Sequence, residues 1–215
     1  MSLPGEVREV ADVAQAFADL VIEQAPASVS LSGGGTAAES YARLAATCPD
    51  WSSVDVYYGD ERWVPLDDPD SNAGMVQRVL LSATPPASHH PMYHDGLTIE
   101  EGAAAYGRLL RDVGPVDLVH LGLGPDGHTA SLFPGSRALD ETRHRVVVNE
   151  DAEHPHPRLT VTYPWLATAS LIVFTVAGEE KRDAFSRIRN GDDLPAARVR
   201  AARIIWLVDP AALGT

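Results

Sequence analysis

The chain has 215 residues, of which 45% are hydrophobic, and this size suits a single domain over residues 1–215 with one buried core. Its 17 Lys and Arg and 30 Asp and Glu give a formal net charge of −13. Nucleic acids and anionic membranes attract basic proteins, so we expect this chain to bind neither.

Cysteine usage and the N-terminal segment indicate the compartment. The single cysteine, Cys48, cannot form an internal disulfide, and we interpret it as a small, half-buried residue after a helix. Residues 1–20 include acidic side chains and lack an apolar stretch of signal-peptide length, and no later segment has about 18 uninterrupted apolar residues. We therefore expect a cytoplasmic protein.

Apolar periodicity and β-branched runs predict alternating helices and strands. In chain order, we expect a helix over 7–24, a strand over 29–31, a helix over 37–46, a strand over 54–58, helices over 73–81 and 99–113, strands over 116–121, 146–148, 159–162 and 171–176, a helix over 179–189 and a strand over 203–208. Continuous apolar strands are typical of a parallel sheet covered on both faces. We predict an α/β fold with three layers, a Rossmann-like, mostly parallel sheet between helices.

Three polar loops follow predicted strands, where open parallel sheets bind their ligands. The first, in LSGGGTAAESYARL (31–44), places Ser32, Gly33, Gly34 and Thr36 before a helix. Backbone amides in such a loop can hold a phosphate, although glycines also serve tight turns. The segment fits neither G-x-G-x-x-G nor the P-loop, so both interpretations stay open at this point.

The second loop, LGLGPDGHTASLFPGS (121–136), contains Asp126 and His128. A histidine can act as a general base near neutral pH, and a nearby carboxylate can fix its tautomer. Alternatively, Asp126 caps a helix that starts near Thr129, and His128 is a surface residue. No second histidine or carboxylate follows at helical spacing, so we expect no metal site.

The third loop begins with Asp60, Glu61 and Arg62, which could bind sugar hydroxyls and a phosphate or could be an exposed, self-paired charge run. Two later cations also stand out. Arg158 precedes a strand, and Lys181 opens a predicted helix, where its charge opposes the helix dipole. An anionic ligand would explain Lys181, but random surface placement would also do so.

Together these clusters resemble the 6-phosphogluconolactonases, within the larger family of glucosamine-6-phosphate isomerases and deaminases. The longest match, D-x-x-x-L-G-x-G-x-D-G-H-x-A-S-x-F-P-G, covers residues 117–135 without a break. The shorter matches are S-G-G-S-T-P at residues 32–37, D-E-R at 60–62, S-N at 71–72, R-x-T-x-T at 158–162 and G-x-x-K at 178–181.

The resemblance implies hydrolysis of 6-phospho-D-glucono-1,5-lactone to 6-phosphogluconate in the oxidative pentose phosphate route, by a cytoplasmic monomer that needs neither metal nor organic cofactor. It implies that His128 is the base that activates water and that Asp126 orients its imidazole. The residues that it implies for substrate binding are Ser32, Gly33, Gly34, Thr36, Asp60, Arg62, Arg158 and Lys181.

Two other functions remain open. An amino-sugar phosphate isomerase or deaminase would share the glycine loop and D-G-H, but such enzymes continue into F-N-E-P, whereas residues 131–134 are Ser-Leu-Phe-Pro. Arg62 also replaces the tyrosine that those enzymes usually carry after D-E. A sugar-phosphate-binding regulator without catalysis would not need Asp126 and His128, and both are present.

The chain departs from the 6-phosphogluconolactonase pattern in two places. Gly35 stands where a serine is usual and Ala37 where a proline is usual, which predicts a looser phosphate site. Family members begin with a strand before the first helix, but MSLPGEVREV leaves almost no room for one. We therefore expect a sheet without this edge strand, or a chain that begins late relative to the family.

Overall fold

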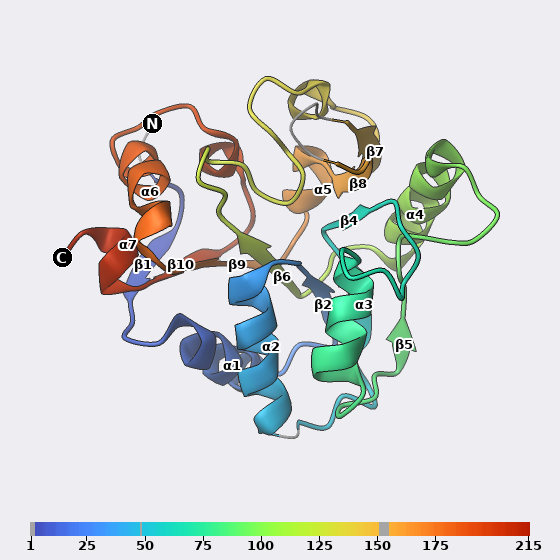
Figure 1. The fold of residues 1–215 in the computed structure, drawn as a ribbon, viewed down its shortest axis with the longest axis horizontal. Coiled ribbons are helices and arrows are strands. Elements are labelled where there is room, and N and C mark those ends of the chain that lie inside the picture. The colour runs from blue at the N-terminus through green and yellow to red at the C-terminus, as the bar shows by residue number, and fades with distance from the viewer. Residues whose placement is uncertain (1–2, 48, 151–154) are drawn as a thin grey trace.

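The computed structural model describes residues 3–47, 49–150 and 155–215, so the interpretation of Cys48 concerns a position outside the described residues. A central sheet of seven parallel strands crosses the molecule (Figure 1). In spatial order the strands are β1 (Glu6–Glu9), β10 (Ile204–Val208), β9 (Leu171–Val176), β6 (Leu118–Gly122), β2 (Ser28–Leu31), β3 (Asp55–Tyr58) and β5 (Ser88–His89). The predicted α/β fold with a mostly parallel sheet is confirmed.

Helices cover both faces of this sheet, with α1, α2 and α3 below it and α5 and α6 above it in the view of Figure 1. The α-helices are α1 (Val13–Gln24), α2 (Gly35–Ala46), α3 (Asn72–Val76), α4 (Ile99–Val113), α5 (Tyr163–Leu166), α6 (Arg182–Arg189) and α7 (Pro210–Leu213). A π-helical turn, Gln77–Leu81, continues α3, and short 3₁₀ helices span Arg137–Asp140, Glu179–Lys181 and Pro195–Arg198.

A second, antiparallel sheet was not predicted as a separate unit. It consists of β4 (Asp60–Arg62), β8 (Arg158–Val161) and β7 (Val146–Asn149), with β8 in the centre. Its register places Arg62 opposite Arg158. The third polar loop of the sequence therefore begins as a short strand, and this pairing joins segments that lie far apart in the sequence.

The expectation of a missing edge strand is wrong, because β1 pairs in parallel with β10 along its whole length. The helix predicted over residues 7–24 starts only at Val13, where the Asp12 side chain accepts a hydrogen bond from the Gln15 amide. As an edge strand, β1 is largely exposed and lacks the apolar run that identified the other strands. Val7 and Val10 fit the apolar spacing of the predicted helix by chance, although they precede α1.

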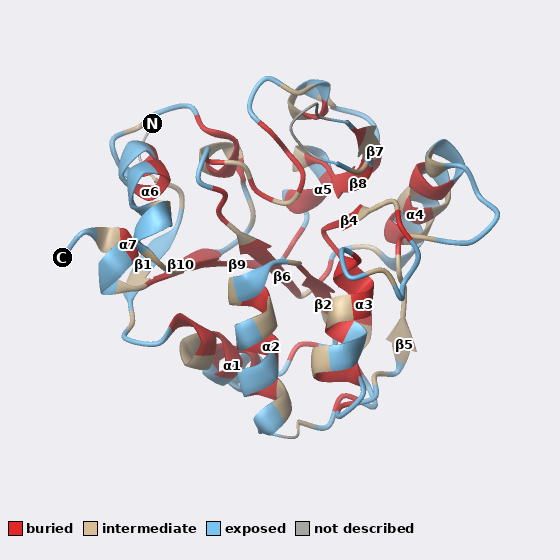
Figure 2. Ribbon diagram, in the orientation of Figure 1, coloured by how far each residue is buried: buried red, intermediate tan, exposed pale blue. Residues whose placement is uncertain are grey.

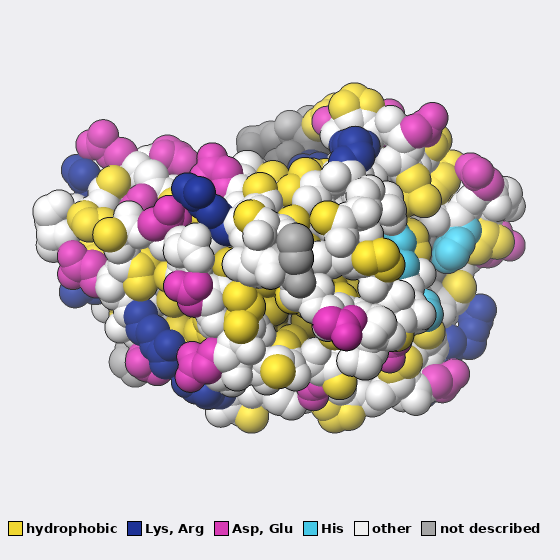
Figure 3. All heavy atoms as spheres, turned by 90° about the horizontal axis from the view of Figure 1, so that it is seen from below, with side chains coloured by type: hydrophobic (Ala, Val, Ile, Leu, Met, Phe, Trp, Pro, Cys, Tyr) yellow, Lys and Arg dark blue, Asp and Glu magenta, His cyan; other side chains and the backbone are white. Residues whose placement is uncertain are grey.

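The buried hydrophobic side chains form one continuous cluster that includes the sheet and both helix layers. Figure 2 shows buried residues along the central strands, with exposed residues on the outer helix surfaces. On the face seen in Figure 3, acidic and basic side chains are interspersed among apolar ones. Among the described residues, no helix combines the length and apolar character needed to cross a membrane.

Candidate active site

A cavity of about 210 Å³ lies beyond the carboxyl ends of β2 and β6, and this volume suits a small metabolite better than a drug-sized ligand. Within the central sheet, the strand that follows β2 in the chain is β3 on one side, and the strand that follows β6 is β9 on the other, so the cavity occupies a topological switch point. Nine of the predicted site residues line it: Ser32, Gly33, Gly34, Thr36, Asp60, Arg62, His128, Arg158 and Lys181. The tenth, Asp126, contacts His128.

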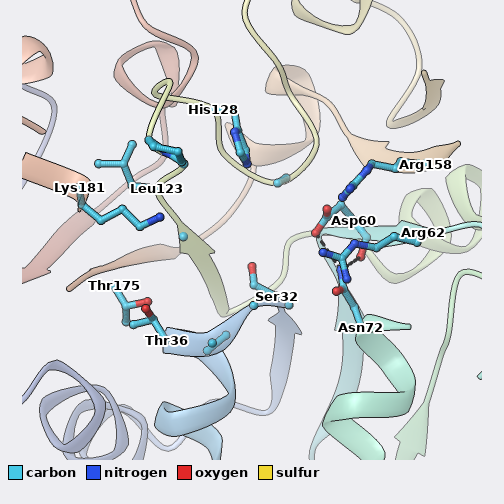
Figure 4. A pocket seen from close by; sticks show the side chains of 18 residues that line it. Ser32, Thr36, Asp60, Arg62, Asn72, Leu123, His128, Arg158, Thr175 and Lys181 are labelled. Carbon is cyan, nitrogen blue, oxygen red and sulfur yellow. Dashed lines mark hydrogen bonds between the residues drawn. The ribbon is translucent and has the colours of Figure 1, made fainter. Parts of the chain in front are cut away.

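The glycine loop brings the start of α2 to the cavity wall (Figure 4). Gly34 is the N-cap residue with a φ of 94°, a conformation that glycine adopts without strain, and no side chain caps the helix. The first amides of a helix lack intrahelical acceptors, so the start of α2 offers donors and a positive dipole end to an anion. At Gly33 an added Cβ would overlap the side-chain amide of Asn72, so only glycine allows this close approach.

Ser32 is fixed by two hydrogen bonds to residues beneath the glycine loop. Its backbone amide donates to the Tyr41 hydroxyl at 2.8 Å, and its own hydroxyl donates to the His120 carbonyl at 2.7 Å. The Ser32 hydroxyl hydrogen is thus already used within the protein. Towards a ligand, this side chain can only accept a hydrogen bond, so its contribution to anion binding is smaller than its place in the motif implied.

His128 and Asp126 form a hydrogen-bonded pair at the cavity. The imidazole Nδ1 lies 2.6 Å from Asp126 Oδ1, which also accepts from the His128 backbone amide at 3.1 Å. Burial alone would raise the pKa of the Asp126 carboxyl, but the His128 amide and imidazole outweigh it and hold that pKa below its usual value. An ionised Asp126 accepts from Nδ1–H, which leaves the lone pair on Nε2 of the neutral ring.

Tight turns fix this pair in space. The Gly124 amide donates to the His128 carbonyl at 2.8 Å, and Gly127 adopts a φ of 88°. A Cβ at Gly124 would overlap the His128 ring. The alternative in which Asp126 caps a helix is wrong, because Thr129 instead forms an isolated antiparallel bridge with Leu132.

The cation and carboxylate cluster on β4 and β8 is not an exposed charge run. Asp60 and Glu61 are buried, and the Asp60 carboxylate accepts from the Ser131 hydroxyl at 2.6 Å and from the side-chain amide of Asn72 at 3.3 Å. Arg62 and Arg158 lie directly opposite each other and both line the cavity. Like charges in this position repel, so an anionic ligand between them would stabilise the pair.

Glu61 has a structural role that the sequence interpretation missed. Its carboxylate accepts from the amides of Asn72 at 2.7 Å and Ala73 at 2.8 Å and from the Ser71 hydroxyl at 3.1 Å, so it fixes the start of α3. Burial raises the pKa of this carboxyl to about 7, although those amides act in the opposite direction. The resulting position of α3 brings Asn72 into the cavity wall. The matched D-E-R and S-N motifs were the available signal.

Lys181 ends the 3₁₀ helix Glu179–Lys181 and extends toward the cavity (Figure 4). Thr175, near the carboxyl end of β9, also lines the cavity, and it was not among the predicted site residues. Among the described lining residues, Asp60 supplies the only carboxylate. No group of three or more His, Cys, Asp and Glu side chains in the described segments has the spacing to hold a metal ion.

Residues 7–206 match the family described as glucosamine-6-phosphate isomerases/6-phosphogluconolactonase. The chain belongs to this family. It is 39% identical over 180 residues to the 6-phosphogluconolactonase of Mesorhizobium japonicum, which covers 80% of this chain and 76% of that protein. The 6-phosphogluconolactonase of Synechocystis sp. is 36% identical over 205 residues, covering 88% and 84% of the two chains.

The solved structures agree with the family match. The crystal structure of 6-phosphogluconolactonase from Thermotoga maritima superposes with a TM-score of 0.85 and 29% identity, over 95% of this chain and 99% of that one. These relatives confirm the resemblance to the 6-phosphogluconolactonases and the predicted class of enzyme, a hydrolase of a sugar lactone.

Proposed function

We propose that the protein hydrolyses 6-phospho-D-glucono-1,5-lactone to 6-phosphogluconate by general-base activation of water. The observation that carries this proposal is the His128–Asp126 pair, which lies on the same cavity as the uncapped start of α2. A base and an anion site on one cavity of small-metabolite size suit a substrate with a phosphate at one end and a reactive carbonyl at the other.

In the proposed reaction, Nε2 of His128 takes a proton from water while the water oxygen attacks the lactone carbonyl carbon. The tetrahedral intermediate then expels the ring oxygen, which receives the proton from the imidazolium, so the histidine returns to its neutral form. Asp126 keeps the ring in the reactive tautomer and stabilises the transient positive charge. General-base catalysis of this type typically contributes about 10² to 10⁴ in rate.

Cations and amides bind the phosphate at one end of the substrate and stabilise the charge that develops at the other. We assign the phosphate to the Gly33–Thr36 loop, the start of α2 and Lys181, because helix amides and an ammonium are suited to a dianion. Arg62 and Arg158 then stabilise the oxyanion that develops on the carbonyl oxygen. Asp60 and Asn72 provide acceptors for sugar hydroxyls. None of these steps uses a cofactor.

The deaminase alternative lacks support at the cavity. Ring opening of an amino sugar calls for a carboxylate after the D-G-H segment, whereas Ser131 and Phe133 are there, and the Ser131 hydroxyl is already bound to Asp60. We also propose that residues 1–215 act as one domain, as a cytoplasmic monomer.

A direct assay tests the proposal. Purified protein is mixed with 6-phosphogluconolactone, and acid release above the spontaneous rate is recorded in a weakly buffered solution with a pH indicator. We expect strong acceleration with this substrate, weaker acceleration with D-glucono-1,5-lactone, and no ammonia from glucosamine-6-phosphate. Ammonia release without lactone hydrolysis would transfer the assignment to the deaminase branch. Light scattering coupled to size exclusion measures the oligomeric state.

A further inference from the structure

A buried chain of polar groups lies beneath the cavity and links the glycine loop to β9. The Ser32 amide contacts the Tyr41 hydroxyl at 2.8 Å, that hydroxyl contacts His120 Nδ1 at 2.7 Å, and His120 Nε2 contacts Thr175 Oγ1 at 2.9 Å. Tyr41 and His120 have no exposed surface. The proposed reaction uses neither of these two side chains, so their arrangement calls for a separate explanation.

The donors and acceptors of this chain can be paired in one direction. A backbone amide can only donate, so the Tyr41 oxygen accepts from Ser32. The tyrosine hydrogen then goes to His120 Nδ1, its other contact. Burial lowers the pKa of His120 to about 3, so the neutral ring carries its proton on Nε2 and donates it to Thr175 Oγ1. The opposite direction would leave the Tyr41 hydrogen buried without an acceptor among the described residues.

Packing keeps the ring in this orientation. Phe17 of α1 stacks on His120 with ring centroids 4.1 Å apart and an interplanar angle of 29°. Tyr41 meets the same ring edge-on at 5.4 Å. Rotation of the imidazole would break its hydrogen bonds to Tyr41 and Thr175 and leave both ring nitrogens against apolar groups. The imidazole is therefore held with Nε2 toward Thr175.

The direction of these hydrogen bonds determines what the Thr175 hydroxyl can offer to the cavity. Its oxygen already accepts from His120, and among the described residues its own hydrogen has no acceptor. Thr175 lines the cavity together with Thr36, at the start of α2, and Lys181 (Figure 4). The hydroxyl therefore presents a hydrogen-bond donor at the point where the start of α2 and the ammonium converge.

We propose that Thr175 is a phosphate ligand, and that Tyr41 and His120 are positioning residues that direct its hydroxyl hydrogen into the cavity. This inference rests on the proposed function and deepens it, because it names a group that selects phosphorylated from unphosphorylated lactone. A dianionic phosphate offers only acceptors, and a hydroxyl whose hydrogen is not used within the described part of the protein is matched to it. A sugar hydroxyl at the same place would be bound less well, because it is neutral and a hydrogen bond to a neutral acceptor is weaker than one to a charged phosphate.

Steady-state kinetics with two substrates tests the role of Thr175. The Thr175→Val variant keeps the shape of the side chain and removes the hydroxyl, and Thr175→Ser retains the hydroxyl. We expect Thr175→Val to raise KM for 6-phosphogluconolactone roughly tenfold with little change in kcat, since a hydrogen bond to a charged group has about this value. Thr175→Ser restores KM, and the loss of kcat/KM in Thr175→Val should be much smaller for D-glucono-1,5-lactone, which has no phosphate. An unchanged KM in Thr175→Val overturns the proposal.

Binding of inorganic phosphate separates this inference from the catalytic assignment. Calorimetry should show a roughly tenfold weaker Kd in Thr175→Val and a Kd near the wild-type value in Thr175→Ser. If the wild-type protein lacks lactonase activity but this difference in phosphate affinity remains, the proposed reaction fails and the phosphate ligand stands. If the wild-type protein is an active lactonase but binds phosphate no more tightly than Thr175→Val, the assignment of Thr175 as a phosphate ligand is overturned and the proposed reaction stands.

The direction of the hydrogen bonds from Tyr41 through His120 to Thr175 can be measured separately. Long-range ¹H–¹⁵N spectra of the wild-type protein should show His120 as the neutral Nε2–H tautomer, and the Tyr41→Phe variant should lose this fixed tautomer and show a raised KM for the phosphorylated lactone alone. Because the wild-type spectrum needs no substitution, poor folding of a variant does not prevent the test. A wild-type His120 with its proton on Nδ1 overturns the proposed direction.

Discussion

The two sides of the cavity are built in opposite ways. On the side of the base, the decisive contacts are local in sequence, because Asp126 and His128 are two residues apart and Gly124 packs on the same ring. On the phosphate side, the contacts join distant segments: 88 residues separate Ser32 from His120, and 55 separate His120 from Thr175. A short loop holds the base, whereas the sheet and two helices together hold the anion site.

Exposure follows the same division. The side chains of His128 and Asp126 are 24% and 45% exposed, so a proton can pass between the base and solvent water. Tyr41, His120 and Thr175 are buried, where a fixed hydrogen-bond direction is not disturbed by water. In the proposed mechanism, the base therefore lies on the accessible loop, and phosphate recognition depends on the rigid interior.

Removal of the base should give the largest effect. His128→Ala should lower kcat for 6-phosphogluconolactone by at least about a hundredfold, with a much smaller change in KM, since the phosphate side is untouched. His144→Ala is the matched control. His144 Nδ1 also binds a nearby carboxylate, Glu141, at 3.0 Å, but it lies away from this cavity. A kcat that survives in His128→Ala would exclude this residue as the base.

A second substitution disturbs the base without removing it. In Gly124→Ala the added methyl group would overlap the His128 ring, so the imidazole must move from its place beside Asp126. We expect a fall in kcat of roughly tenfold, smaller than in His128→Ala because the base remains present. Gly107→Ala in α4 is the control, since its nearest atom would be 4.0 Å away. Equal kcat values in both variants would show that the turn does not position the base.

On the phosphate side, two neighbouring glycines provide a matched pair. Gly33→Ala would force Asn72 away from the loop, whereas a methyl group at Gly35 meets nothing within 4 Å. We expect Gly33→Ala to raise KM several-fold and to leave kcat nearly constant, and Gly35→Ala to have a clearly smaller effect. Initial rates over a range of lactone concentrations separate the two constants. A larger KM change in Gly35→Ala would contradict the packing explanation.

The same division explains what the sequence could predict. The five inner strands of the central sheet and the D-G-H loop depend on runs of adjacent residues, so their patterns indicated both the fold and His128. The D-E-R and S-N motifs marked Glu61 and Asn72, but the roles of these two residues and of Thr175 come from partners in other elements, which no local pattern shows. The two edge strands, β1 and β5, were not predicted because their residues follow no apolar pattern.

The stability of the anchor at Glu61 should depend on pH. Burial raises the pKa of this carboxyl from 4.5 to about 7 in the folded protein, so between these values the folded state holds a proton that the unfolded chain releases. The free energy of unfolding should therefore fall as pH rises through this range, by roughly 3 kcal/mol at most, and remain level above it.

Urea titrations at several pH values between about 4.5 and 8 measure this slope. Glu61→Gln should flatten it, because the amide does not titrate, whereas Glu39→Gln on the exposed surface of α2 should keep the wild-type slope. The Glu61→Gln variant should also be less stable at low pH, since the substitution replaces one acceptor of the α3 amides by a donor. Parallel slopes in wild type and Glu61→Gln would mean that this carboxylate is ionised in the folded state, and its bonds to α3 would then stabilise the anchor at every pH of the series.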